Sequence, residues 1–147
     1  MKSAAYQHLL LAVDFAHETD LVVERAHQLK VQCQARLSLL HVVEHLPMSY
    51  SGDLVLPDDF DLEQELLEIA KKQMEVLGNR LGIEPGDRHI EIGGTGHTIL
   101  RLASTLGADL IVLGSHGRHG LSVLLGSTAR TVLNGAGCDV LAVRIGE

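Results

Sequence analysis

Short apolar runs alternate with segments of helical periodicity along most of this 147-residue chain. Four runs have the length and the Leu, Val and Ile content of buried strands, at residues 8–13, 36–43, 109–113 and 139–143. Residues 88–92 alternate between polar and apolar, as a shorter strand does. Apolar residues at steps of three and four predict helices over residues 18–32, 62–81, 98–106 and 127–133. The alternation predicts an α/β fold with an open, doubly wound, five-stranded parallel sheet and helices on both faces.

One long loop interrupts this alternation. Residues 44–61 are rich in Pro, Ser, Gly and Asp, and connections of this length in compact domains are usually functional or mobile. The sequence contains no repeat, no low-complexity tract and no linker that would divide it. We therefore expect residues 1–147 to form a single domain.

Composition and charge narrow the classes of partner. The formal charge of −7 argues against a nucleic-acid partner, since phosphate backbones are bound through an excess of Lys and Arg. A small anion remains compatible, because backbone amides bind anions locally. Two cysteines, Cys33 and Cys138, are too few for a disulfide framework. The chain has neither a secretory signal nor an apolar stretch long enough for a membrane span, so we expect a cytoplasmic protein.

The candidate site follows the fourth predicted strand. The strand breaks into Gly-Ser-His-Gly at residues 114–117, and Gly-Ser-Thr follows at residues 126–128, before the last predicted helix. A buried strand, a glycine turn and a hydroxyl-bearing helix start can together hold a phosphate group. Ligands of open parallel sheets bind at the carboxyl ends of strands, where the strand order reverses. If the first and fourth strands flank that point, Asp14 lies opposite Gly114.

Each of these residues also has a purely structural interpretation. Gly114 and Gly117 are compatible with a tight turn at positive φ. Gly126 and Ser127 are compatible with a helix start capped by a hydroxyl group, and Asp14 with a cap of the helix that follows it. The pairing of the two glycine segments with Asp14 favours the functional interpretation.

Other binding motifs are missing from the expected places. No GxGxxG turn follows the first strand and no GKS or GKT sequence occurs, which argues against a dinucleotide-binding domain and a P-loop NTPase. His97, His116 and His119 are candidate metal ligands, but no carboxylate or cysteine pattern accompanies them. Neither cysteine lies in a recognisable nucleophile motif. We expect no metal site, and a binding protein rather than an enzyme.

The order of these segments resembles the universal stress protein family. The segments that carry the resemblance are LLLAVDF, LSLLHVVE, DLIVLGSHGRHG, LLGSTA and CDVLAVRI, and they cover almost the whole chain. The GSHGR segment followed by GST is the most specific part. The resemblance implies an adenine nucleotide alpha hydrolase-like fold and a homodimer that pairs its C-terminal strands, residues 139–145. It implies Val140, Ala142 and Arg144, or their alternating neighbours, near the two-fold axis.

The resemblance also implies a nucleotide site. The family's nucleotide-binding branch holds ATP through a Gly-x2-Gly-x9-Gly-Ser/Thr motif, and ATP or AMP with Mg²⁺ is the ligand implied here. Carried over by position, the first-strand and second-strand residues meet adenine and ribose, and these are Ala12, Val13, Asp14 and Val42. The phosphate-binding positions are Gly114, Gly117, Gly126, Ser127 and Thr128.

One spacing departs from the motif. Eight residues separate Gly117 from Gly126, where the motif has nine. One residue spans roughly 3.5 Å, enough to shift the two halves of the site out of register unless slack at Gly120 absorbs it. Two functions therefore remain open. The first is an adenine-nucleotide-binding stress-response regulator with at most slow ATP hydrolysis and an unknown protein partner. The alternative is a nucleotide-independent dimeric interaction module of the same family.

Overall fold

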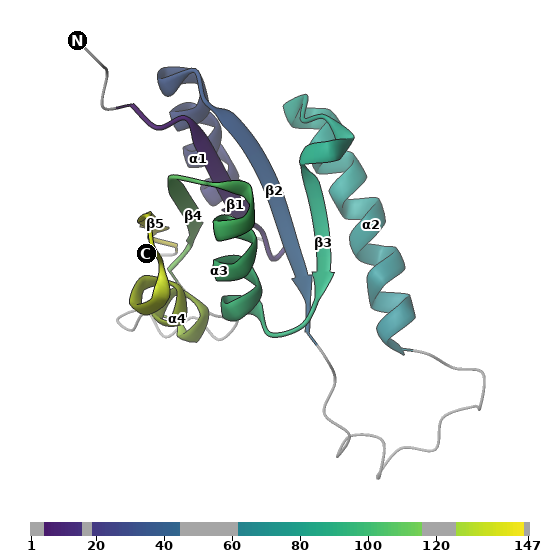
Figure 1. The fold of residues 1–147 in the computed structure, drawn as a ribbon. Helices are drawn as coiled ribbons and strands as arrows, with labels where there is room; N and C mark the ends of the chain where they lie inside the picture. The colour runs from purple at the N-terminus through teal and green to yellow at the C-terminus, as the bar shows by residue number, and fades with distance from the viewer. Residues whose placement is uncertain (1–4, 16–18, 45–61, 116–125, 146–147) are drawn as a thin grey trace.

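The computed structural model describes residues 5–15, 19–44, 62–115 and 126–145, and it contains the predicted alternation of strands and helices (Figure 1). The strands are β1 (His8–Ala12), β2 (Arg36–Val43), β3 (Arg88–Ile92), β4 (Leu110–Gly114) and β5 (Asp139–Val143). The helices are α1 (Thr19–Cys33), α2 (Leu62–Leu81), α3 (Thr95–Leu106) and α4 (Ser127–Gly135), and a 3-10 turn, η2 (Pro85–Asp87), precedes β3. Most of the predicted long loop, at residues 45–61, lies outside the described residues.

The sheet is parallel throughout, with the strand order β3-β2-β1-β4-β5. The chain runs outward from β1 through β2 to β3, and then returns to the other side of β1 with β4. The strand order therefore reverses between β1 and β4, which meets the condition on which the predicted position of Asp14 depended. β3 and β5 form the two edges.

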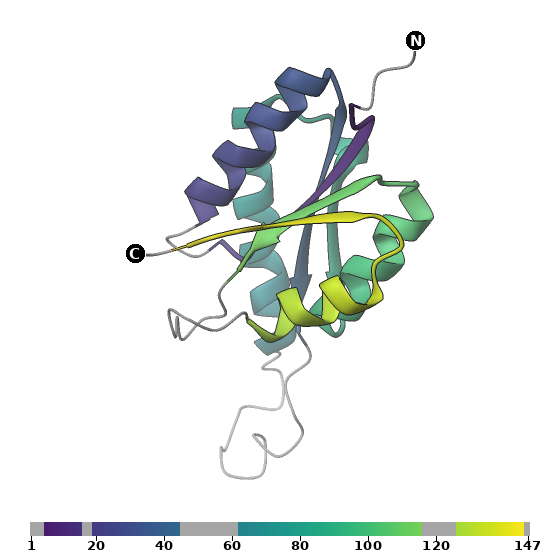
Figure 2. The same ribbon diagram turned by 90° about the vertical axis from the view of Figure 1, so that its left-hand side faces the viewer.

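Helices cover both faces of the sheet (Figure 2). On one face α1 and α2 pack over Leu9 and Leu11, and on the other α3 and α4 pack over Leu10. All three of these leucines have no exposed surface. Successive strand residues point to opposite faces, so a central strand covered on both sides must be apolar at every position. This explains the continuous apolar run that predicted β1.

Two glycines that lie outside the predicted helices 98–106 and 127–133 lie inside the observed ones. α3 begins at Thr95, three residues earlier than predicted, and includes Gly96; α4 continues through Gly135. A Cβ on Gly96 would lie 2.6 Å from Cγ2 of Thr131, and one on Gly135 would lie 2.7 Å from Cδ1 of Leu100. The glycines allow α3 and α4 to approach closely, a requirement that local periodicity does not reveal.

The longest described helix, α2, is amphipathic but leaves part of its apolar surface exposed. Its buried residues include Ala70, Met74 and Leu77. An adjacent stripe remains exposed and consists of Leu62, Leu66, Ile69 and Val76. Neither α2 nor any other helix within the described ranges has both the length and the apolar character needed to cross a membrane.

Candidate functional site

The ends of β1 and β4 meet at the carboxyl edge of the sheet. The register pairs Leu11 with Val112, so Gly114 at the end of β4 lies level with Val13, two residues further along. Val13 continues the ladder beyond β1, because its N–H donates to a β2 carbonyl at 2.9 Å. Asp14 follows at once and is exposed. Asp14 and Gly114 therefore both lie at the carboxyl edge beside the strand reversal, with Asp14 one residue beyond the predicted position opposite Gly114.

The predicted base-contacting positions divide between the two faces of the sheet. Ala12 pairs with Leu40, so Val42 lies two residues further along β2, level with Asp14. Ala12 and Val42 both pack against the core under α3 and α4, where Val42 is 8% exposed. Val13 packs against the opposite core, under α1 and α2. Ala12 and Val42 thus share the face on which α4 packs, and Val13 does not.

The start of α4 is fixed beside the ends of β4 and β5. The N–H of Gly126 donates to the carbonyl of Ser115 at 2.7 Å, and the N–H of Ser115 donates to the carbonyl of Val143 at 2.8 Å. Gly126 is the N-cap (φ −64°, ψ 158°), so Ser127 and Thr128 are helical residues and no hydroxyl cap is present. The first N–H groups of a helix have no acceptor within it and carry partial positive charge. This arrangement suits a bound anion.

At Gly114, side-chain packing rather than backbone conformation leaves little room for a Cβ. A Cβ at this position would overlap Cδ1 of Ile145 and would lie 3.5 Å from Cγ2 of Val22. Among the described glycines, positive φ occurs at Gly82, Gly93 and Gly107 and not at Gly114. The structural interpretation of Gly114 therefore has a different basis from the one the sequence suggested.

The middle of the predicted motif lies outside the described residues. This applies to Gly117, to the eight-residue segment 118–125 and to His116 and His119. His97 is exposed on α3. Within the described ranges, no three His, Cys, Asp or Glu side chains come together as a metal site requires.

Two ring-bearing residues at the same edge were not anticipated from the sequence. Phe15 has a φ of 60°, and its ring centroid lies 4.7 Å from that of His41 with the planes tilted by 43°. His41 Nδ1 lies 2.7 Å from the carbonyl of Val13, which only accepts, so this nitrogen carries the proton. An aromatic residue after a strand was visible in the sequence, but positive φ at a bulky residue is uncommon and has no sequence signal.

A buried polar network lies at the opposite, amino edge of the sheet and was also not anticipated. His8 is 8% exposed, and its Nε2 lies 2.8 Å from Oγ of Ser38. Ser38 donates to Asp87 at 2.9 Å, and the Arg36 guanidinium donates to the same carboxylate at 2.7 and 3.0 Å. The Ser38 hydroxyl proton is used on Asp87, so Ser38 accepts from Nε2–H of His8.

The two titratable groups of this network respond to different causes. The hydrogen bond from Arg36 lowers the pKa of Asp87, and desolvation opposes this shift. Desolvation lowers the pKa of His8, and the charge of Arg36 lowers it further. Both shifts belong to the amino edge and leave the candidate site unaffected.

Known proteins match nearly the whole chain. The model of the universal stress protein family matches residues 5–144. Universal stress protein A homolog 1 of Coxiella burnetii is 38% identical over 142 residues, covering 97% of this chain and 99% of its own. Universal stress protein A homolog 2 of the same organism is 43% identical over 141 residues, covering 95% of this chain and 96% of the homolog.

Solved structures share the fold of this chain. Hypothetical protein MJ0577 superposes with a TM-score of 0.81 at 25% identity, covering 98% of this chain and 99% of its own. Universal stress protein UspA from Lactobacillus plantarum superposes with a TM-score of 0.75 at 26% identity, covering 97% of this chain and 100% of the UspA chain. A universal stress protein in complex with cAMP shares the fold, with a TM-score of 0.63 at 20% identity, covering 95% and 98%. These neighbours confirm the adenine nucleotide alpha hydrolase-like fold, and with the family match they establish that this chain belongs to the universal stress protein family.

Proposed function

We propose that this chain binds an adenine nucleotide, ATP or AMP, at the carboxyl edge of its sheet and acts as a homodimeric stress-response regulator. One observation carries the proposal. The start of α4, which has a glycine N-cap, is hydrogen-bonded to Ser115 just after β4, where β4 adjoins β1 and the strand order reverses. Open α/β sheets bind ligands at such a point. The universal stress protein solved with cAMP supports the proposal only as a precedent for the fold.

The proposed contacts follow the family motif. Asp14 and Val42 lie level with each other at the ends of adjacent strands, where they would bound adenine and ribose, with Ala12 and Val13 beside them. The phosphates would meet the N–H groups at the start of α4 and the family's phosphate-binding positions, with Mg²⁺ as their counterion. Those positions are Gly114, Gly117, Gly126, Ser127 and Thr128.

We propose binding with at most slow turnover. Phosphoryl transfer requires both a carboxylate that holds Mg²⁺ and a residue that orients or activates the nucleophile. Asp14 is the only carboxylate among the positions carried over from the family motif. A single carboxylate fits ligand recognition better than efficient hydrolysis.

Thermal unfolding with ATP, AMP or GTP tests nucleotide binding. At a ligand concentration of 100 times Kd, binding to the native state adds about 2.7 kcal/mol, a rise in Tm of roughly 5–10 °C for a chain of this size. ATP and AMP should raise the Tm more than GTP does. No rise with any nucleotide at millimolar concentration would contradict the proposal.

A charge variant identifies where the nucleotide binds. Ser127 is exposed in the first turn of α4, so Ser127→Glu leaves the fold intact, because a carboxylate there suits the helix dipole. The same carboxylate repels a bound phosphate, so ATP affinity should fall about tenfold or more. Gln28→Glu, which adds the same charge at an exposed position in α1, is the control and should bind as the wild type does. Gly114 is unsuitable for this purpose because its substitution disturbs Ile145.

Dimerisation through β5 is the second part of the proposal. β5 is an edge strand, and its apolar residues Val140, Leu141 and Ala142 are only half-buried in the single chain. An exposed apolar edge favours pairing with another strand. Sedimentation should show a dimer that Ala142→Lys dissociates, while Ile92→Lys on the opposite edge strand leaves it intact. A monomeric wild type at micromolar concentration would refute this part.

The alternative function, a nucleotide-independent interaction module, is favoured by one observation. The exposed stripe on α2, formed by Leu62, Leu66, Ile69 and Val76, offers apolar surface to a protein partner. This alternative predicts a dimer whose Tm is unchanged by nucleotide. The thermal-shift experiment therefore separates the two functions.

A further inference from the structure

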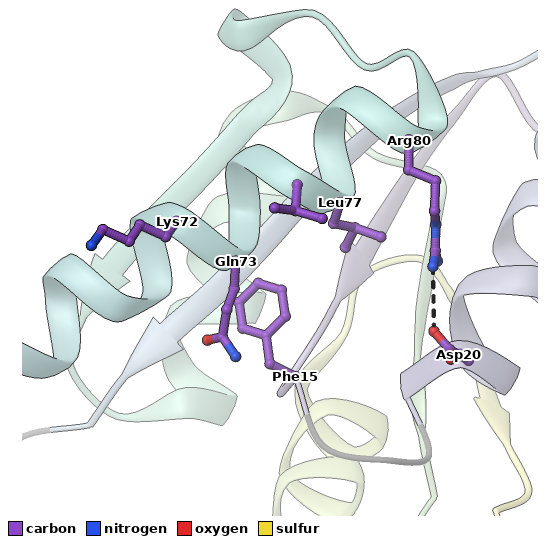
Figure 3. A pocket seen from close by; sticks show the side chains of 7 residues that line it. Phe15, Asp20, Lys72, Gln73, Leu77 and Arg80 are labelled. Atoms are coloured by element: carbon purple, nitrogen blue, oxygen red, sulfur yellow. Dashed lines mark ion pairs between the residues drawn. The ribbon is translucent and has the colours of Figure 1, made fainter.

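A groove of about 350 Å³ lies on the face of the sheet covered by α1 and α2, between the first turn of α1 and the second half of α2 (Figure 3). Its volume falls within the range of small-molecule sites. Its lining includes Phe15, Asp20, Lys72, Val76, Leu77 and Arg80. The start of α4 belongs to a helix on the opposite face, so this groove is separate from the proposed phosphate position.

The middle of the groove is apolar, and packing against the core fixes its side chains. Leu77 is 7% exposed and belongs to the core, whereas Val76 is 69% exposed at the rim. Phe15 adopts a φ of 60°, a backbone conformation that bulky residues rarely adopt. Such conformations occur where the surrounding structure enforces them, and they are concentrated at ligand-binding sites. The ring packs against His41 and lies beneath Gln73 and Leu77 of α2 (Figure 3). A flat or aliphatic group would therefore find a preformed apolar wall.

Two cations lie at opposite ends of this apolar surface (Figure 3). Lys72 and Arg80 are eight residues apart on α2, about 12 Å along the helix axis. Arg80 lies 3.6 Å from Asp20, but these side chains are 54% and 77% exposed, and exposed pairs of this kind contribute little. Lys72 pairs with no carboxylate in the described part of the chain. The groove thus carries two cations and one carboxylate, a net positive charge on a chain whose formal charge is −7.

We propose that this groove binds a small amphipathic anion. Its aromatic or aliphatic body would lie on Phe15, Val76 and Leu77, and its carboxylate, sulfonate or phosphate group would pair with Lys72 or Arg80. The apolar wall provides burial, and the cations select an anionic head group over a neutral or cationic one. Phe15 follows Asp14 directly in the chain, so the groove adjoins the edge at which we propose that the nucleotide binds.

Titration with the anionic aromatic dye 8-anilinonaphthalene-1-sulfonate tests the proposal on the full chain. We expect one equivalent to bind per chain, measured by fluorescence and calorimetry. Val76→Glu should weaken binding about tenfold or more, because the introduced carboxylate lies four residues from both Lys72 and Arg80 and repels the sulfonate. Val31→Glu is the matched control. Val31 is 60% exposed on α1, outside the groove residues, so its affinity should match the wild type.

A second variant removes the charges rather than the apolar surface. The double variant Lys72→Gln/Arg80→Gln changes two exposed side chains and should also weaken binding, by up to about fivefold for each ion pair lost, since exposed ion pairs are weak. A cooperative melting transition verifies that each variant is folded. If Val76→Glu is unfolded, the double variant alone tests the proposal. The proposal is overturned if the wild type shows no saturable one-to-one binding. It is equally overturned if neither folded groove variant binds more weakly than Val31→Glu.

Discussion

Replacing Ser38 by alanine tests the buried network at the amino edge of the sheet. Ser38 has no exposed surface, and its hydroxyl group accepts from His8 Nε2 at 2.8 Å and donates to Asp87 at 2.9 Å. Ser38→Ala leaves the His8 ring nitrogen without a partner in a buried position. Asp87 keeps its bonds from Arg36, so most of the cost comes from His8.

The expected loss follows from these contacts. A buried polar group left unpaired costs about 1–3 kcal/mol, and a lost hydrogen bond to a carboxylate adds to this. We expect Ser38→Ala to lower the free energy of unfolding by about 2–3 kcal/mol, a large share of the 5–15 kcal/mol typical of a domain. Alanine is slightly smaller than serine, so a cavity adds little.

Urea denaturation followed by circular dichroism measures this loss as a fall in the midpoint at constant slope. Ser104→Ala, at an exposed position in α3, is the matched control and should change stability by less than about 0.5 kcal/mol. The cost of Ser38→Ala should shrink when His8→Leu is also present, because no unpaired ring nitrogen remains. Equal stabilities of Ser38→Ala and Ser104→Ala would refute the reasoning.

Three further outcomes follow from the structure. The pKa of His8 is lowered from its usual 6.5, so protonation of this ring destabilises the folded state. The free energy of unfolding should therefore fall as the pH drops below 6.5, by at most about 1.4 kcal/mol per pH unit. Denaturation between pH 7 and about 5 should show this loss in the wild type and not in His8→Gln. Gly96→Val should cost about 1–3 kcal/mol in urea, because its side chain meets Thr131, and an unchanged midpoint would contradict the close approach of α3 and α4. Gly107→Ala should cost about 1 kcal/mol because its φ is 71°, whereas Gly86→Ala, at a position with open space and no positive φ, should not.

The fold was predictable because its main signal is local. The continuous apolar runs of β1 and β4 arise from burial on both faces, and the alternation with helices leaves a parallel sheet as the expected arrangement. The helix boundaries were less accurate at Gly96 and Gly135. Glycine normally ends a helix, but here each glycine provides room for a residue of the facing helix. That requirement comes from tertiary packing and leaves no periodic trace.

The candidate site was predictable only in outline. Asp14 and Gly114 could be assigned to the carboxyl edge because parallel strands end there together, and Val42 was assigned through the family resemblance. Phe15 and His41 could not, since their contact depends on a positive φ and joins residues 26 positions apart in the sequence. The His8 and Ser38 hydrogen bond joins residues 30 positions apart for the same reason.

Native mass spectrometry of the purified protein with added ATP is the most direct test of nucleotide binding by the dimer. The account predicts a dimer that carries one adenine nucleotide per chain, with occupancy that falls in Ser127→Glu and is unchanged in Gln28→Glu. A wild-type protein that carries no nucleotide at millimolar ATP would contradict it.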